Sequence, residues 1–324
     1  MSNKVLKPKK ASLYQFTQKY SNNIDNCIEF FKSMKWPEGF SCDRCGCHKY
    51  YLVKRVGKTK TSYVLECSSC HKQHSLLSGT IFQSCKLDLY KLLLGIFLFF
   101  NENKGISAIE LCSILDVNYK TALLLENKCR ILMSLSNSDK LLNSLFYEAD
   151  VFNIGAKSKN KAGRASEQQP ILGILSTDKE NNYPRFIKLR VITDYTGLSL
   201  KKNIEKCCVL SHDALLNTDG EKGFNTLNEE IQVKNEKISY EEKDHRLLWL
   251  NIIIGNIKNN ITGIYHGITK REMPLFLNEQ EYRFNHRKMG KTIMDKIKKY
   301  LQRSFPISHR QIVYILNISA PHFS

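Results

Sequence analysis

The sequence has few acidic residues and no long apolar run. Its 324 residues include 31 Asp and Glu against 49 Lys and Arg, so the formal net charge is +18. A surplus of this size favours a polyanionic partner, with nucleic acid as the first candidate and an anionic membrane surface as the second. The longest apolar run, from Leu92 to Phe100, is interrupted by Gly95. It is too short to cross a bilayer, which excludes a membrane-spanning protein.

A secretion signal is also missing. The basic start, with Lys4, Lys7, Lys9 and Lys10, has no apolar segment after it, so it predicts a solvated tail rather than a signal peptide. Without secretion, the eleven cysteines are better explained as thiols or metal ligands than as disulfides. With 42% hydrophobic residues, the chain can form two or three compact units.

Two cysteine pairs share one spacing. They are Cys42 with Cys45 and Cys67 with Cys70, separated by 21 residues. Such pairs can supply four thiolates in a tetrahedron, which structural Zn²⁺ prefers. Segments 50–53 and 63–66 resemble a small β-hairpin, so we predict a zinc ribbon that needs its metal to fold. Four unrelated buried thiols are the alternative. Further candidate ligands lie nearby, and the first two could compete: Cys47, His48, His71 and His74.

Two predicted helices follow the ribbon and a buried helix near residues 87–100. Ser107 can cap a helix that runs to Leu115, residues 116–118 make a turn, and a longer helix runs from Tyr119 to about Met133. Helices joined by three residues resemble a helix-turn-helix. In that interpretation Tyr119, Lys120 and Thr121 face DNA. The alternative is a helical hairpin in a core.

Strand patterns dominate from residue 145 onward. Segments 145–154, 170–176 and 185–192 predict three consecutive strands, followed by a helix and a further strand, which is an α/β layout. Asp150 and Asp219 lie at or near the ends of two apolar runs, and Glu148 shares the face of Asp150. Carboxylates at strand ends often converge on Mg²⁺ or Mn²⁺. A simple Asp-Gly turn is the alternative.

Polar and basic groups recur in the C-terminal half. Asn256 and Lys258 are polar residues in the apolar stretch 247–268. They could serve as a metal ligand and a phosphate contact, respectively. The alternative is that Asn256 is a buried amide whose hydrogen bonds are satisfied. Residues 157–164 form a basic loop that either contacts phosphates or is solvated. From Glu281 to Arg310 there are nine Lys and Arg against two acids. That density predicts a phosphate-tracking surface, with a solubilising face as the alternative.

The order of these motifs resembles the insertion-sequence transposases of the ISXO type, which are related to the Merlin transposons, over about residues 13–290. Asp150 falls on the first catalytic Asp, Asp219 on the second, and Asn256 with Lys258 resembles the third element. The other motifs that carry the resemblance are Trp36–Phe40 before the cysteines, Ser78–Phe82, Gly105–Ser107, Tyr119–Ala122, Gly263–Gly267 and Tyr282–Arg287.

The resemblance implies an RNase H-like catalytic domain whose acids hold two Mg²⁺ or Mn²⁺ ions, and a reaction that cleaves a transposon end and transfers the strand into a target. The implied partners are transposon-end and target DNA and further copies of the chain, with no membrane. The compartment would be the cytoplasm or nucleoid in a prokaryote and the nucleus in a eukaryote.

Some family positions differ in this chain. Val151 stands where the family has Glu, Gly155-Ala156 where it has two glycines, Gly255 where it has Ser and Asn251 where it has His. Loss of such neighbours can weaken a metal site. A transposase-derived protein that binds DNA without cutting it is therefore a second hypothesis. A zinc-stabilised protein-interaction module is a third, and it fits the ribbon but not the basic C-terminal residues.

These observations predict five segments. Residues 1–40 form a lead-in and helix, 41–75 the zinc ribbon, 76–140 the helix-turn-helix region, 141–290 the RNase H-like domain and 291–324 a basic tail. The sequence assigns no role to Glu148, Glu279 or Glu281.

Overall fold

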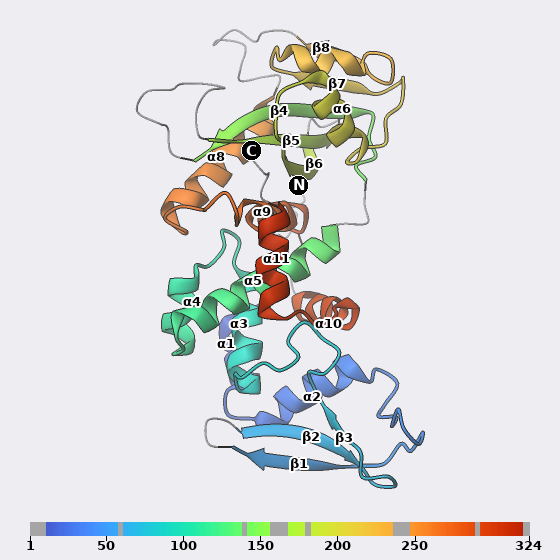
Figure 1. The fold of residues 1–324 in the computed structure, drawn as a ribbon, viewed down its shortest axis with the longest axis vertical. Coiled ribbons are helices and arrows are strands. Elements are labelled where there is room, and N and C mark those ends of the chain that lie inside the picture. Colours follow the sequence, from blue (N-terminus) through green and yellow to red (C-terminus); the bar gives the residue numbers. More distant parts are fainter. Residues whose placement is uncertain are drawn as a thin grey trace, which may run out of the picture. The chain divides into compact units, whose positions relative to one another are not determined.

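The structure is a computed structural model that describes residues 11–57, 61–137, 141–155, 168–178, 183–235, 247–288 and 292–319. Its contacts divide the chain into two units (Figure 1). The first unit comprises residues 1–135 and 287–312, and the second comprises residues 136–286 and 313–324. Within the described residues, none of the helices has the length and apolar character needed to span a membrane.

The first unit has a helical core to which both ends of the chain contribute. Ser12, Asn23 and Asp88 cap the first three of its helices with their side chains. The third of these helices is buried along most of its length, as its apolar sequence predicts. The core helices are α1 (Leu13–Tyr20), α2 (Ile24–Lys35), α3 (Leu89–Asn101) and α10 (Ile293–Arg303).

Helix α10 (Ile293–Arg303) packs against α2 and α3, although these two helices end at Lys35 and Asn101. The Tyr300 ring stacks on Phe100 with centroids 6.0 Å apart, and Gln302 Nε2 donates to the Met34 carbonyl at 2.8 Å. Ile297 and Leu301 are buried on the same side. The segment predicted as a basic tail thus contains α10, followed by α11 (His309–Ser319).

The zinc-ribbon segment is a three-stranded antiparallel sheet in the order β1-β2-β3. Its strands are β1 (Tyr50–Val56), β2 (Thr61–Cys67) and β3 (Gln73–Ser75). The helical pair that follows is α4 (Ala108–Leu115) and α5 (Tyr119–Asn137). Ser107 caps α4, and Asn118 Oδ1 accepts from the Thr121 N–H at 2.9 Å at the start of α5. The predicted two helices and three-residue turn are present.

The second unit is built on a mixed five-stranded sheet in the order β6-β5-β4-β7-β8. The first three strands along the chain pair antiparallel, and β7 and β8 then add in parallel on the other side of β4. The strands are β4 (Phe146–Ile154), β5 (Gln169–Asp178), β6 (Tyr183–Val191), β7 (Leu215–Thr218) and β8 (Gln232–Asn235).

Helices cover both faces of this sheet (Figure 1). Because side chains alternate along β4, Tyr147 and Ala149 enter the core on one face, and Phe152 and Ile154 enter the core on the other. The first face packs on α6 (Gly197–Glu205) and the short 3₁₀ helix η2 (Lys222–Leu227). The second packs on α8 (Leu248–Gly263) and α9 (Met273–Asn285).

Helix α9 also closes the edge of the sheet at β6. Asn285 uses its amide like a strand partner, accepting from the Ile187 N–H at 2.8 Å and donating to the Ile187 carbonyl at 3.0 Å. The Glu281 carboxylate accepts from the Leu189 N–H at 3.2 Å and pairs with Lys188 at 3.1 Å. Covering an edge in this way prevents another strand from pairing with it.

Candidate metal centres and catalytic face

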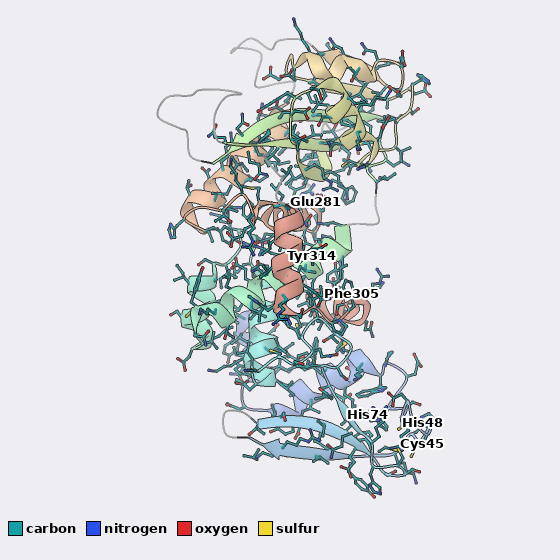
Figure 2. The ribbon with its side chains drawn as sticks, in the orientation of Figure 1. Cys45, His48, His74, Glu281, Phe305 and Tyr314 are labelled. Carbon is teal, nitrogen blue, oxygen red and sulfur yellow. The ribbon has the colours of Figure 1, made fainter. Side chains whose placement is uncertain are left out.

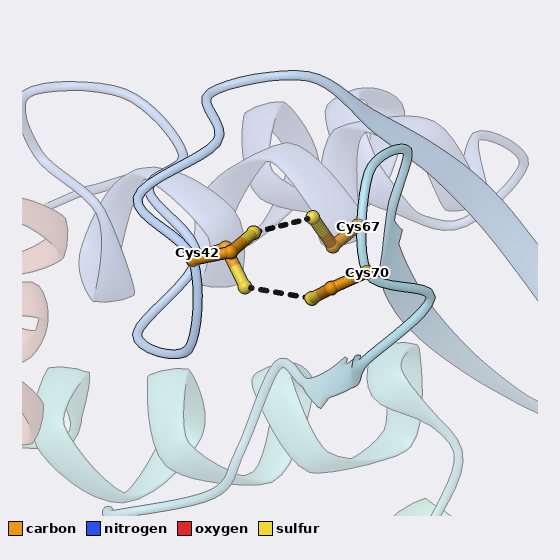
Figure 3. Close-up of side chains that lie close together, drawn as sticks. Cys42, Cys67 and Cys70 are labelled. Carbon is orange, nitrogen blue, oxygen red and sulfur yellow. Dashed lines mark hydrogen bonds between the residues drawn. The ribbon is translucent and has the colours of Figure 1, made fainter.

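Four cysteine thiols converge where the two loops of the ribbon meet. Cys42 Sγ lies 3.6 Å from Cys70 Sγ, and Cys45 Sγ lies 3.5 Å from Cys67 Sγ. All four sulfur atoms are within 4.8 Å of one another. Figure 3 shows Cys42, Cys67 and Cys70 pointing toward a common centre. This donor set fits a tetrahedral metal ion, and the alternative of four unrelated thiols does not describe the geometry.

The two loops are near copies of each other. The Gly46 N–H donates to the Cys42 carbonyl at 2.9 Å, and the His71 N–H donates to the Cys67 carbonyl at 3.1 Å. Both donors follow the second cysteine of a pair, and both have a left-handed backbone, with φ of +70° and +55°. The repeated turn aims both cysteines of each pair at one point.

His74 lies beside this cluster. A ring nitrogen of His74, the Cys42 sulfur and an Asp43 carboxylate oxygen are within 4.8 Å of one another. Its ring is buried between the edges of Trp36 and Phe40. Burial alone raises the pKa of the Cys42 thiol, but backbone hydrogen bonds and the nearby His74 imidazole bring that pKa down to about 6. His74 therefore favours the thiolate form that binds metal.

The other neighbouring candidates have different contacts. Cys47 Sγ lies 3.5 Å from Ser68 Oγ, His48 Nδ1 is 3.0 Å from the Phe40 carbonyl, and His71 Nδ1 is 3.3 Å from Glu66. None of these three belongs to the four-thiol group. Figure 2 labels His48, His74 and Cys45 at the same end of the ribbon. A position at this end is therefore not enough to make a side chain part of the four-thiol group.

Asp150 lies on β4, and Asp219 directly follows the end of the neighbouring parallel strand β7. Ala149 of β4 is in register with Thr218 of β7, so the next residues are Asp150 and Asp219. Because side chains alternate along a strand, Asp150 projects from the same face as Phe152, which is the α8 face. Both side chains are half-buried. Gly220 follows with φ of +72°, so a turn also begins there. The turn is therefore present, and the pairing of the two acids at a metal site stays a prediction.

Glu148 connects this face to α8. It is buried, and its Oε2 accepts from the Leu250 N–H at 3.1 Å in the first turn of the helix. The side chain at the helix start, Leu247, provides no cap, so Glu148 satisfies a backbone donor that a cap would otherwise satisfy. Burial raises the pKa of Glu148 to about 7, although the hydrogen bond from the Leu250 N–H acts to lower that pKa. Glu148 therefore fixes where α8 begins relative to β4.

The polar residues of α8 lie on two different flanks. Lys258 Nζ reaches 5.7 Å from the centre of the Phe152 ring on β4. Asn251, two turns earlier, shares that flank. Asn256 is exposed and lies on the flank of Trp249 and Asn260. Trp249 contacts Tyr183 on β6. Asn260 donates to Gln280 on α9. The helix thus presents Asn251 and Lys258 toward β4, and Asn256 away from it.

The positions that differ from the family pattern can now be placed. Val151 packs against the core on the α6 side of the sheet, away from the acids. Gly155 retains a left-handed φ of +123°, and residue 156 lies outside the described residues. At Gly255 an added Cβ would meet no atom within 4 Å, so this position has room for Ser. Among the described positions of this set, Asn251 and Gly255 lie on the flank of α8 that also carries Lys258.

The predicted DNA-contacting residues start α5. The Tyr119 side chain is 50% exposed and Lys120 is exposed, whereas Thr121 donates through Oγ1 to Asn118 at 3.0 Å. The basic loop 157–164 lies outside the described residues. In the segment 281–310, Arg283 pairs with buried Glu279 at 2.7 Å and Lys298 Nζ donates to Ser33 at 2.9 Å. These two cations therefore serve the fold.

The fold and the thiol cluster together define a zinc-ribbon protein with an RNase H-like domain. The transposase zinc-ribbon domain matches residues 23–73, and the ISXO2-like transposase domain matches residues 146–285. The predicted resemblance is confirmed: the chain carries the zinc ribbon and the transposase domain of the ISXO-type transposases. The predicted fold class is confirmed with it.

Other comparisons are more distant. A chain in the crystal structure of a pre-cleavage Mos1 transpososome is similar at 9% identity and a TM-score of 0.27, covering 71% of this chain and 79% of that chain. A likeness of that degree carries nothing about the site. A comparison with curated proteins finds no match.

Proposed function

We propose that this protein is a DNA transposase that binds transposon ends and catalyses metal-dependent cleavage and strand transfer. The observation that supports it best is the register of β4 with β7, in which Asp150 and Asp219 follow a matched pair of residues. Two carboxylates on one face are hard oxygen donors and fit Mg²⁺ or Mn²⁺. Bound divalent ions would supply activation of the attacking oxygen and stabilisation of the leaving oxygen at phosphorus.

Each of the other roles in this proposal belongs to a residue of the chain. Asp150 and Asp219 hold the metal, and Glu148 positions α8 through the Leu250 N–H. Lys258 offers a cation to a phosphate oxygen of the DNA. As the third polar group we propose Asn251, which shares the flank of Lys258. The alternative, Asn256, rests on the motif resemblance alone.

The ribbon and α5 supply DNA recognition in this proposal. Zn²⁺ held by Cys42, Cys45, Cys67 and Cys70 orders the ribbon, and Tyr119, Lys120 and Thr121 begin a helix that contacts DNA. The protein would act as a homo-oligomer on the two transposon ends and the target.

Cleavage of DNA that carries the flanking terminal repeats tests the proposal. With Mn²⁺ present, wild type should nick this DNA, and Asp150→Ala and Asp219→Ala should bind it without nicking. The matched control is Asp213→Ala, an exposed acid just before β7. Nicking that persists in both acid variants would refute the metal site.

A second pair of variants tests α8. Asn251→Ala should lose cleavage, and Asn256→Ala, the same change on the other flank, should keep it. The opposite result would restore Asn256 as the third element. The pair is well matched because both side chains are exposed on the same helix.

The second candidate is a transposase-derived protein that binds DNA without cutting it. The observation that favours it is α8 itself, which carries no carboxylate in Leu248–Gly263. An amide is a weaker ligand for a hard cation than a carboxylate. Wild type that binds the repeats but does not nick them with either Mg²⁺ or Mn²⁺ would establish this candidate.

A further inference from the structure

Strand β1 of the ribbon, with its two flanking segments, carries charge of one sign only. Between Asp43 and Glu66 the sequence contains six cations and no acid. The six cations are Arg44, Lys49, Lys54, Arg55, Lys58 and Lys60. The two acids that border this stretch are engaged within the ribbon, since Asp43 pairs with Lys72 at 2.7 Å and Glu66 accepts from Gln73. Most of the charge of these two acids is thus directed at partners outside the stretch, although Arg55 also acts on Glu66 through space.

The same strand is exposed and lies at an edge. In the order β1-β2-β3 it pairs with β2 alone. Tyr51 is 61% exposed and Leu52 is 45% exposed, and Lys54 and Arg55 are both exposed. We call Lys49, Tyr51, Leu52, Lys54 and Arg55 the β1 surface. It offers cations on both sides of the strand and an aromatic ring between them.

We propose that the β1 surface is a DNA-backbone contact of this protein, separate from the start of α5. The inference rests on the proposed function, because it names a further surface for the same partner. Lys and Arg contact phosphates without reading sequence, and an exposed tyrosine can pack against the sugar-phosphate chain.

Protection of the strand edge is the competing explanation for the charges. Edge protection can use charges of either sign. The segment 44–60 has six cations and no acid, and this one-sided charge is what a polyanion would attract. A second copy of the chain would bring the same positive charge to the edge, so pairing between copies is disfavoured.

Salt-dependent binding of the full-length protein to labelled duplex DNA with a flanking repeat tests this proposal. Lys54→Gln combined with Arg55→Gln should weaken binding and reduce the slope of log K against log salt by about two. The matched control is Lys202→Gln with Lys206→Gln, which removes the same charge from exposed positions at the end of α6. It should leave both quantities near wild type.

A second variant and a folding check complete the design. Tyr51→Ser should weaken binding with an unchanged slope, because it removes contact area but no charge. Each variant should hold one zinc per chain as wild type does. If the charge variant binds no differently from its control, the β1 surface is not a DNA contact, while the proposed function stands.

Two other outcomes are decisive. If wild type binds no DNA at all, the proposed function fails and the β1 surface fails with it. If the charge variant instead changes the oligomeric state on gel filtration while DNA binding is unaltered, β1 is a contact between copies and the proposal is overturned.

Discussion

The two cysteine loops are equivalent in backbone but differ in one residue. Gly46 and His71 follow the second cysteine of each pair, and both have a positive φ. Glycine adopts this conformation without a steric penalty, whereas a histidine does so at a cost. We expect His71→Gly to raise the free energy of unfolding of the zinc-loaded protein by up to about 1 kcal/mol and Gly46→Ala to lower it by a similar amount. Chemical denaturation of both variants checks this, and equal effects of the same sign would contradict it.

His74 offers a residue-scale test of the metal centre. His74→Phe keeps an aromatic ring between Trp36 and Phe40 but removes the imidazole that favours the Cys42 thiolate. Loss of such a supporting group typically weakens metal affinity about 10–100-fold. Competition for zinc with a coloured chelator measures it. His48→Phe is the matched control and should bind zinc like wild type, because His48 lies outside the thiol group.

Sequence reasoning located the metal-binding cysteines but not their supporting group. Equal spacing identifies two loops of the same shape, and so the four thiols were predictable. The position of His74 depends on how β3 pairs with β2, where His74 stands opposite Leu65. Similarly, Asp150 and Asp219 were predicted one by one, but the parallel pairing of β4 with β7 that precedes them joins distant segments of the chain. Asn256 and Asn251 lie on different faces of α8. The sequence of this helix is apolar on nearly every side, so it does not indicate which face points toward β4.

Helix α9 is the element that locks the β6 edge. Glu281 is fully buried and pairs with Lys188 and Arg190 as well as with the Leu189 N–H. We expect Glu281→Gln to destabilise the protein by about 3–5 kcal/mol, because it leaves a buried lysine without its counter-charge. The free energy of unfolding measures this. Glu205→Gln, an exposed change on α6, should have almost no effect, and equal losses would contradict the prediction.

Helix α10 was not predicted from the sequence. Residues 287–310 are so rich in Lys and Arg that charge obscures a helical pattern of Ile293, Ile297 and Leu301. The buried face is defined by its partners α2 and α3, which lie in the first third of the chain. Strands β4 and β5, in contrast, were predictable because a short apolar run bounded by turn residues is a local signal.

The two units should respond differently to loss of metal. The ribbon belongs to the first unit and depends on its ligands for order, whereas the sheet of the second unit has cores on both faces. Calorimetry should therefore show two transitions, and a zinc chelator should lower only one of them. A single transition, or an equal shift of both, would contradict independent units. Proteolysis of the chelated protein should cut within residues 41–75 first.

The contribution of α10 to the first unit has a consequence for synthesis of the protein. The ribosome makes the N-terminal helices first, and α10, which completes their core, is made only after the five strands and helices α6, α8 and α9. The five-stranded sheet can therefore form earlier than the complete first unit, even though the ribbon is translated before it. A nascent or prematurely terminated chain carries α2 and α3 with an uncovered apolar face. Full assembly of the first unit is thus delayed until α10 has been made.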